Sequence, residues 1–196
     1  MDHYYSEQQK SLLDIKKIKQ KIKGQEFEFY TASGVFSKKK IDKGTLILAE
    51  GMIINKNQKV LDIGCGIGVL GIAAAKLFNA NVVMSDINKR AVMLARKNIE
   101  LNNMKAEVYQ GNLYEKINQN DFDAILSNPP QTAGKELCFE LIEKSKKYLK
   151  DGGNLQLVAR HNKGGKTLSE KMKEVFGNVK IVAKKSGYWV YLSVKN

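Results

Sequence analysis

Short apolar runs alternate with longer helical patterns from residue 59 to residue 196, and this alternation restricts the fold more than any other feature. The apolar runs of strand length are 59–63, 81–85, 106–110, 122–126, 155–159, 179–183 and 188–194. The segments with helical spacing are 68–78, 89–101, 135–149 and 165–176. The alternation predicts an α/β fold with a doubly wound, mainly parallel sheet covered by helices. Only a few residues around Ser186 and Gly187 separate the last two runs, too few for a parallel crossover, so we expect the last of seven strands to be antiparallel.

The 196 residues, 43% of them hydrophobic, suit one compact domain that carries a short appendage. We expect residues 1–50 to form an N-terminal basic extension that packs on a core domain of residues 51–196. In this extension, residues 11–23 place isoleucines at helical spacing among lysines, which predicts a basic amphipathic helix. Residues 26–30 alternate in the manner of a half-buried strand. The sequence therefore predicts a small helix and a strand that precede the strands of the sheet in the chain.

No apolar run approaches the ~20 residues that a membrane span needs. Residues 1–5 also lack the basic-then-apolar order of a signal peptide. We therefore expect a cytoplasmic protein with no membrane partner. The two cysteines, Cys65 and Cys138, form no CxxC pair and have no nearby histidine at ligand spacing. This pattern predicts neither a disulfide framework nor a metal site.

The formal net charge is +13, and the excess lies outside the middle of the chain. Residues 61–130 carry 7 basic and 7 acidic side chains, whereas residues 1–60 carry 12 and 7 and residues 131–196 carry 14 and 6. Lysines and arginines that neutralise phosphates bind nucleic acid with little regard to its sequence. The distribution favours a polyanionic partner such as RNA, although lysine-rich surfaces also arise from genome composition or thermal adaptation.

A glycine-rich loop, residues 60–68 with the sequence VLDIGCGIG, connects the first strand-like run to the first helical segment. Glycines allow the backbone to turn sharply and approach a ligand, and the N-terminus of the following helix offers unpaired N–H groups. The loop therefore predicts a site for a nucleoside-bearing cofactor. Residues 66–71 also read GxGxxG, and Asp86 follows Gly66 by 20 residues, so the spacing by itself leaves a dinucleotide such as NAD open.

The tetrapeptide Ser127-Asn128-Pro129-Pro130 follows the strand-like run 122–126. The prolines fix their own φ angles and favour an extended geometry at Asn128. If the Asn128 side-chain oxygen and the Pro129 carbonyl accept the two N–H hydrogens of a planar amine, the nitrogen lone pair points at an incoming methyl group. Such a transfer needs positioning rather than a metal or a covalent nucleophile, so we expect Asn128, Pro129 and Pro130 to be catalytic. An ordinary Asn-Pro turn at the end of a strand is the alternative interpretation.

The pattern of residues 60–68, xLDxGxGxG with Asp62 at its acidic position, resembles motif I of class I S-adenosylmethionine-dependent methyltransferases. Asp86, just after the next strand-like run, matches the ribose-binding acid of that family. The resemblance implies a Rossmann-like fold and S-adenosylmethionine as the cofactor. The residues that it implies for cofactor binding are Asp62, Gly64, Cys65, Gly66, Gly68, Asp86, Ile87, Asn112, Leu113 and Asn128.

Further segments make the resemblance more specific, to one family of methyltransferases. They are residues 30–37, the basic stretch 38–43 with Gly44, the SNPP tetrapeptide and residues 151–153. Together they are similar to the catalytic domain of the small-subunit (16S) rRNA guanine-N2 methyltransferase family, in its short single-domain form. This similarity covers nearly the whole chain and implies methyl transfer to the N2 amine of a guanine in 16S rRNA. It also implies that this RNA, free or within the small ribosomal subunit, is the partner.

Substrate contacts are harder to derive from the sequence, because Gln131 stands where many members of that family have an aromatic residue that stacks on the target base. Phe36, Tyr30 and Trp189 are other aromatic candidates for this contact. The basic loop 160–167 is similar to a phosphate-binding P-loop but has an arginine in place of the first glycine. The residues that we expect to contact the substrate are Phe36, Lys38, Lys39, Lys40, Arg160 and Lys163.

Other functions fit the same features. A methyltransferase for a protein glutamine amide or a small amine would use the same Asn-Pro-Pro geometry without RNA. A non-catalytic RNA-binding module would keep the fold and the basic flanks, and would tolerate the loss of Asn128. Competition between NADH and S-adenosylhomocysteine for the protein would instead indicate an oxidoreductase.

Overall fold

The computed structural model of the chain describes residues 13–35, 40–130 and 134–196. The strands are β1 (Ile15–Ile22), β2 (Gln25–Ala32), β3 (Lys59–Ile63), β4 (Asn81–Asp86), β5 (Ala106–Gln110), β6 (Phe122–Ser127), β7 (Leu149–Arg160), β8 (Lys180–Lys185) and β9 (Tyr188–Val194). The helices are α1 (Lys43–Gly51), α2 (Val69–Phe78), α3 (Lys89–Leu101), α4 (Lys135–Tyr148) and α5 (Lys166–Phe176), and a short π-type turn, η1 (His161–Gly165), leads into α5. The elements predicted from residue 59 onward are all present, with β7 beginning earlier than expected, at Leu149.

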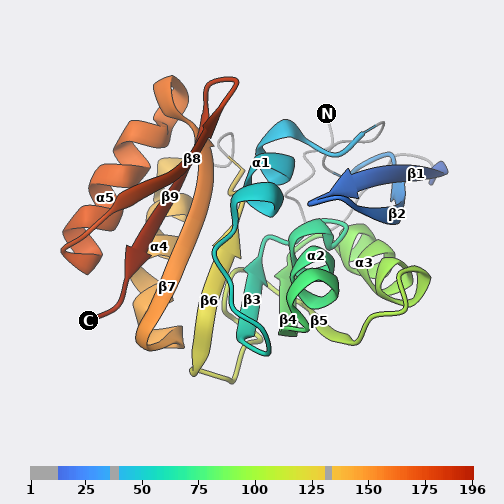
Figure 1. Cartoon of the computed structure of the whole chain (residues 1–196), viewed down its shortest axis with the longest axis horizontal. Coiled ribbons are helices and arrows are strands. Elements are labelled where there is room, and N and C mark those ends of the chain that lie inside the picture. Colours follow the sequence, from blue (N-terminus) through green and yellow to red (C-terminus); the bar gives the residue numbers. More distant parts are fainter. Residues whose placement is uncertain (1–12, 36–39, 131–133) are drawn as a thin grey trace.

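Seven strands form one sheet in the order β5-β4-β3-β6-β7-β9-β8 (Figure 1). The strands from β5 to β7 in this order are parallel, and β9 runs antiparallel to both β7 and β8. The prediction of a mainly parallel sheet with an antiparallel last strand is therefore confirmed. The chain fills the sheet from β3 toward β5 and then, from β6, in the other direction. The carboxyl ends of β3 and β6 thus lie at a topological switch point, where open α/β sheets bind ligands.

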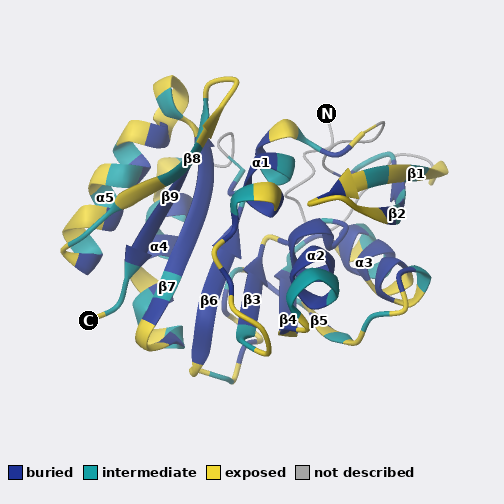
Figure 2. Cartoon of the chain, viewed as in Figure 1, coloured by how far each residue is buried: buried dark blue, intermediate teal, exposed yellow. Residues whose placement is uncertain are grey.

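Apolar side chains cover both faces of this sheet. On one face, Val60 and Met84 pack with residues of α1, α2 and α3. On the other face, Leu61 and Ile125 pack with residues of α4 and α5. Figure 2 shows the central strands of the sheet buried, β8 largely exposed at its edge, and exposed residues on the outer sides of α4 and α5. None of the helices that the structure describes combines the length and the apolar composition needed to cross a membrane. Burial on both faces explains why the strands read as nearly continuous apolar runs.

The prediction of an N-terminal helix over residues 11–23 is wrong, because the described part of this range is mostly strand. β1 and β2 form an antiparallel hairpin. Lys23 and Gly24 connect them with positive φ angles of 45° and 80°, the geometry of a two-residue hairpin turn. Burial alternates along this strand, because Ile18 and Gln20 are partly buried, Ile22 is fully buried, and the lysines between them are exposed. The isoleucines of β1 fit either periodicity, and pairing with β2 decides between them.

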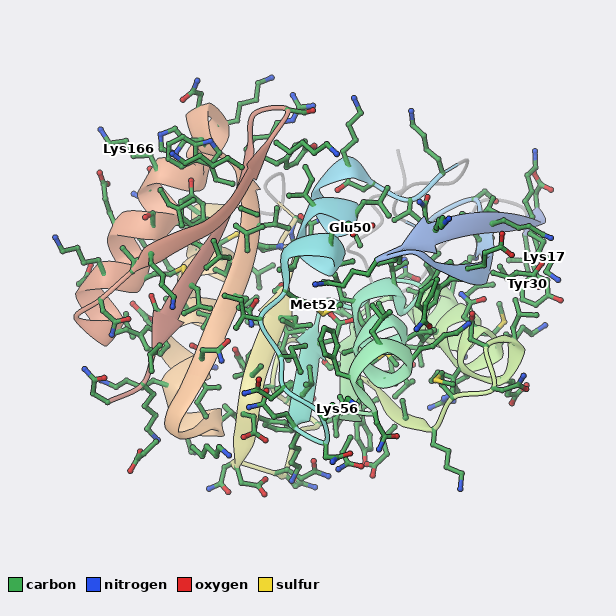
Figure 3. The ribbon with its side chains drawn as sticks, viewed as in Figure 1. Lys17, Tyr30, Glu50, Met52, Lys56 and Lys166 are labelled. Carbon is green, nitrogen blue, oxygen red and sulfur yellow. The ribbon has the colours of Figure 1, made fainter. Side chains whose placement is uncertain are left out.

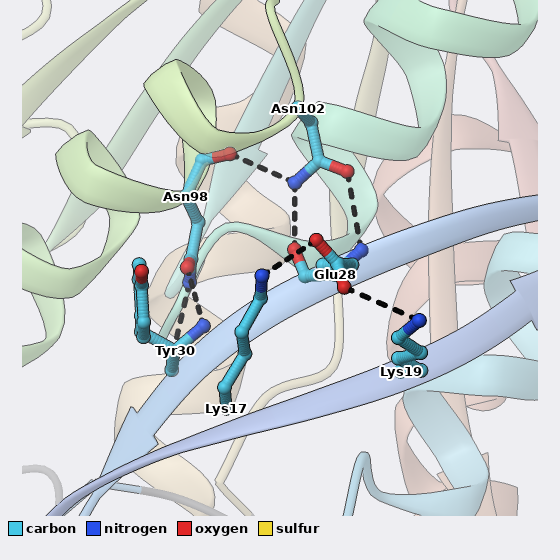
Figure 4. A network of polar contacts seen from close by, with 6 residues as sticks. All are labelled: Lys17, Lys19, Glu28, Tyr30, Asn98 and Asn102. Carbon is cyan, nitrogen blue, oxygen red and sulfur yellow. Dashed lines mark hydrogen bonds and ion pairs between the residues drawn. The ribbon is translucent and has the colours of Figure 1, made fainter.

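The strand predicted in front of the sheet is confirmed as part of β2, and α3 holds it in place (Figure 4). The buried Asn98 side chain accepts a hydrogen bond from Tyr30 N at 2.6 Å and donates to Tyr30 O at 3.0 Å. It also donates to Ile67 O, in the glycine loop, at 3.0 Å. Asn102 makes a similar pair of bonds with the main chain of Glu28. α3 therefore fixes the hairpin and the glycine loop relative to each other.

α1 is a helix that the sequence pattern did not predict. Asp42 caps its N-terminus by accepting a hydrogen bond from Thr45 N at 3.1 Å. Beyond its C-terminus, the main chain of Ile53 pairs with the buried Gln156 side chain of β7, at 3.0 and 2.8 Å. Between these ends, α1 packs against β7, β9 and α2. α1 spans residue 50, where we expected the N-terminal extension to end and the core domain to begin. The division of the chain into these two parts stays a prediction.

We predict that Asn98→Ala destabilises the protein by about 2 to 3 kcal/mol, because it leaves main-chain groups of the hairpin and the glycine loop without partners. Urea denaturation followed by circular dichroism measures this loss. Lys97→Ala, at an exposed position of the same helix, is the matched control and should change stability by less than about 0.5 kcal/mol. Equal stability of the two variants would mean that Asn98 does not hold the hairpin.

Candidate functional site

A cavity of about 660 Å³ opens at the carboxyl ends of β3, β4, β6 and β7, and its volume is within the range of cofactor sites. The predicted site residues that line it are Asp62, Gly64, Cys65, Gly66, Asp86, Ile87, Asn112, Leu113, Asn128, Pro129, Pro130, Arg160 and Lys163. Gly68 is the N-cap residue of α2, and Lys40 is exposed; neither is part of the described lining. The predicted contacts that lie outside the described residues are Phe36, Lys38, Lys39 and the Gln131 position. The fold thus brings the glycine loop and the SNPP tetrapeptide to one cavity.

The glycine loop is held by acceptors at the end of β4. Ser85 O accepts hydrogen bonds from Gly64 N at 2.8 Å and from Cys65 N at 3.0 Å. Asp86 Oδ2 accepts from Gly66 N at 2.7 Å. Gly64 and Gly66 have φ angles of 69° and 56°, which residues with side chains rarely adopt. A Cβ on either glycine would meet no atom within 4 Å, so an open cradle lies beside the loop backbone.

Asp62 is a buried carboxylate in the lining of the cavity. Its Oδ2 accepts a hydrogen bond at 2.9 Å from Gly71 N, in the first turn of α2. Its Oδ1 has no hydrogen-bond partner within the described chain. Burial raises the pKa of Asp62 to about 7, and the nearby Asp86 carboxylate adds to the increase. A ligand ammonium group beside Oδ1 would satisfy this acceptor, and S-adenosylmethionine carries such a group.

Asp86, the predicted ribose-binding acid, also organises the protein around it. Its Oδ1 accepts a hydrogen bond from Asn88 N at 2.8 Å, while its Oδ2 holds Gly66. Each carboxylate oxygen can accept a further hydrogen bond, so ribose hydroxyls can still donate to it. Removal from water raises the pKa of Asp86. Asn88 caps α3 and donates to Gly34 O at 2.9 Å, so the segment after β2 is tied to the same corner of the cavity.

Asn128 is held in one orientation by the first turn of α1. Its Nδ2 donates to Asp42 Oδ2 and to Thr45 Oγ1, both at 2.9 Å. Because an ionised carboxylate only accepts hydrogen bonds, Asp42 fixes the amide nitrogen on its own side and turns the Asn128 oxygen the other way. All three side chains belong to the cavity lining, next to Pro129. The geometry therefore presents the Asn128 oxygen as a hydrogen-bond acceptor.

The cavity is lined by charges of both signs. Asp42, Asp62 and Asp86 contribute carboxylates at the ends of the strands and at α1, whereas Arg160 and Lys163 contribute cations where β7 passes into η1. Within the described ranges, no group of three or more His, Cys, Asp or Glu side chains is placed to hold a metal ion. The acidic part suits a cationic ligand, and the basic part suits an anionic one.

Tyr188, at the start of β9, is the aromatic residue among the described lining residues. The Arg160 guanidinium lies over its ring, 5.1 Å from the centroid. Gly44 of α1 leaves room for this ring, because a Cβ there would come within 2.9 Å of Tyr188 Cε1. Trp189, one of the aromatic candidates, stacks on His161 with ring centroids 3.5 Å apart. Tyr188 is thus the aromatic side chain in the described lining of the cavity, with Arg160 over its ring and α1 beside it.

The polar and aromatic lining residues that were not predicted include Asp42, Thr45, Asn88 and Tyr188. Asp42 and Thr45 act on Asn128 from 86 and 83 residues away, a distance that no local pattern bridges. An N-cap signal was present, since Asp42 precedes an apolar helical run, but it indicates a helix start rather than a site. Tyr188 occupies an ordinary strand position and gives no signal of its own.

Comparison with known proteins points to one family. Residues 26–192 match the methyltransferase small domain family. A Bacillus subtilis protein named YbxB is 35% identical over 202 residues, covering 99% of this chain and 98% of that protein. A Haemophilus influenzae protein named ribosomal RNA small subunit methyltransferase C is 36% identical over 88% of this chain and 52% of its own length.

The fold is also similar to the solved structure of the T. thermophilus 16S rRNA N2 G1207 methyltransferase in complex with AdoMet and guanosine. The TM-score is 0.82 and the sequence identity 26%, over 95% of this chain and 51% of that one. The chain therefore spans about half the length of these two ribosomal RNA methyltransferases and nearly all of the B. subtilis relative.

We predict that S-adenosylhomocysteine binds more tightly as the pH rises toward about 7, and that its affinity then levels off. Below that pH, Asp62 must release a proton before it pairs with the ligand ammonium group, so affinity falls by up to about tenfold per pH unit. Isothermal titration calorimetry between about pH 5.5 and 8 measures this slope. Asp62→Asn, which cannot ionise, should bind weakly and without the slope. An equal slope in both proteins would assign the titration to another group, such as Asp86.

Proposed function

Because the chain belongs to the methyltransferase small domain family, we propose that it transfers a methyl group from S-adenosylmethionine to the exocyclic N2 amine of a guanine in 16S rRNA. The names of the H. influenzae and T. thermophilus relatives support this substrate. AdoMet and guanosine occur together in the T. thermophilus complex, which supports the pairing of cofactor and base. The observation that carries the proposal is the fixed orientation of Asn128 in a cavity that the glycine loop also lines.

The amine of guanine is a poor nucleophile because its lone pair is delocalised into the ring. Asn128 Oδ1 and the Pro129 carbonyl can accept its two N–H hydrogens and turn the lone pair toward the methyl donor. Asp42 and Thr45 keep the Asn128 oxygen, rather than its nitrogen, toward the amine. The nitrogen lone pair forms the new N–C bond as the C–S bond breaks, and the amine then loses one proton to solvent. Positioning of this kind can supply several kcal/mol of the barrier, roughly 7 to 11 in favourable cases.

When bound, S-adenosylmethionine supplies an electrophilic methyl group on a positively charged sulfur. The glycine loop would hold it, with Asp62 at its ammonium group and Asp86 at its ribose. The unpartnered Oδ1 of Asp62 and the open cradle beside Gly64 and Gly66 support this fit. The carboxylates around the cavity would also stabilise the positive charge that passes to the amine nitrogen during transfer.

The other side of the cavity suits a nucleotide. Tyr188, with the Arg160 guanidinium over its ring, is the aromatic residue of the described lining beside which a base would lie, and Arg160 and Lys163 are cations that suit a phosphate. A base must leave its stack to enter, which costs a few kcal/mol in a duplex and less in a loop. We therefore expect a guanine in an unpaired or readily opened part of the RNA to be the target.

We predict that Asn128→Ala lowers kcat for methylation of 16S rRNA by about 10²-fold or more, with a much smaller effect on S-adenosylhomocysteine affinity. The assay uses tritiated S-adenosylmethionine with unmodified 16S rRNA or small subunits, followed by digestion to nucleosides. Label in N2-methylguanosine should be lost in this variant and kept in Asn120→Ala, an exposed control. Label in protein or a small amine instead of RNA would support a methyltransferase activity with a different substrate.

Thr45→Val tests the orientation of Asn128 separately, since it removes one acceptor of the amide while keeping the side-chain shape. Loss of this hydrogen bond should lower kcat about five- to tenfold, equivalent to about 1 kcal/mol, without changing KM for RNA. Thr45→Ser retains the hydroxyl and should remain close to the unmodified enzyme. Equal losses in the valine and serine variants would show that the hydroxyl does not orient Asn128.

A further inference from the structure

A second cavity, of about 510 Å³, lies between the β1–β2 hairpin, α1 and β8. Figure 1 shows α1 between β8 and the hairpin. The lining of this cavity contains Lys21 from β1, Lys43 from α1, and Lys184 and Lys185 from β8, and we call it the lysine groove. It unites lysines from the two basic flanks of the sequence, which lie more than a hundred residues apart. The fold thus concentrates on one surface the charge excess that the sequence divides between its ends.

The lysine groove carries an excess of positive charge, with four lysines and one glutamate in its lining. Its four lysines are exposed, and none of them forms an ion pair with an acid of the described residues. The Lys184 ammonium group lies 4.1 Å from the centroid of the Trp189 ring, which packs on the α4–α5 face of the sheet, so the groove charges on the α1 face are those of Lys21, Lys43 and Lys185. Glu50, labelled in Figure 3, is the acid among the described lining residues, and its Oε1 already accepts a hydrogen bond from Lys23 N at 3.0 Å. The groove is therefore ready to bind an anion.

The lysine groove and the methyl-transfer cavity are neighbours. The first turn of α1 contributes Asp42 and Thr45 to the cavity and Lys43 to the groove. The β8–β9 hairpin contributes Lys185 to the groove and Tyr188 to the cavity. Since successive residues have Cα atoms only about 3.8 Å apart, the two linings meet at the start of α1. A linear polymer lying in the groove would therefore pass the mouth of the cavity.

We propose that the lysine groove binds the phosphate backbone of the RNA strand whose target base enters the cavity, an inference that rests on the proposed function. Lysine ammonium groups attract phosphates as point charges, without reading the bases. The charges of Lys21, Lys43 and Lys185 come from three elements and line an open groove, which suits successive phosphates better than one small anion. A membrane surface would need exposed apolar side chains beside the lysines, whereas in this lining Ile47 is buried and Leu46 is only partly exposed.

The double variant Lys21→Ala/Lys185→Ala tests this inference, because it removes two groove charges and changes no residue that lines the cavity. Lys97→Ala/Lys105→Ala is the matched control, since it removes two exposed lysines near α3 and β5 and gives the same net charge. Binding of unmodified 16S rRNA is measured between about 50 and 200 mM salt. We expect the groove variant to bind RNA about tenfold more weakly. The slope of log K against log salt should become shallower by about 1.4, because each lost phosphate contact changes it by about 0.7. The control should stay within about twofold of the unmodified protein.

Two further readouts separate RNA binding from chemistry. S-adenosylhomocysteine affinity, and kcat at saturating RNA, should be unchanged in both double variants. The inference is overturned if the groove variant binds RNA like the unmodified protein, or if the control loses as much affinity. It is also overturned if the groove lysines are needed for phosphatidylserine vesicles and not for RNA. If the unmodified protein binds RNA through the groove but methylates no guanine, the proposed function fails and the groove assignment stands.

Discussion

Two carboxylates near the ends of adjacent parallel strands hold the glycine loop and the first turn of α2 in place, and the rest of the site depends on them. Asp62 of β3 accepts the N–H of Gly71, and Asp86 of β4 accepts the N–H of Gly66. Loop backbone groups removed from water need such partners, so the acceptors stabilise a backbone path that leaves room for a ligand. The removal of these acids from water raises their pKa values. A cationic ligand would offset that penalty, so the interaction that shapes the loop also favours a particular occupant.

α1 joins this cofactor cradle to the surface that faces the substrate. Its first turn orients Asn128 through Asp42, packs closely against Tyr188 at Gly44, and contributes Lys43 to the lysine groove. One short helix therefore links the proposed chemistry, base stacking and RNA binding. Acidic groups surround the place proposed for the sulfonium, while cations lie where phosphates would arrive. This separation of charge lets a cationic cofactor and a polyanionic substrate approach the same reaction from different environments.

The elements from residue 59 onward could be predicted because strands buried on both faces leave continuous apolar runs in the sequence. The positions of the two motifs followed from this, since ligands bind where parallel strands end. β1 could not be predicted in the same way, because its isoleucines fit helix and strand alike. Its pairing with β2, which Asn98 in turn holds to α3, decided the outcome. α1 was missed because its start lies next to a lysine run, residues 38–40, that shows no apolar periodicity.

The amino-acid sequence by itself determined the alternation of strands and helices, the glycine loop and the SNPP tetrapeptide, because each depends on residues that are neighbours in the chain. Only the tertiary structure decided that Asp42 and Thr45 orient Asn128 and that Tyr188 lines the cavity. It also decided that the lysines of the two basic flanks meet in one groove. These contacts join segments far apart in sequence. They exist because the strands pack in an order that differs from their order in the chain, and that order depends on contacts between distant segments, which no local pattern encodes.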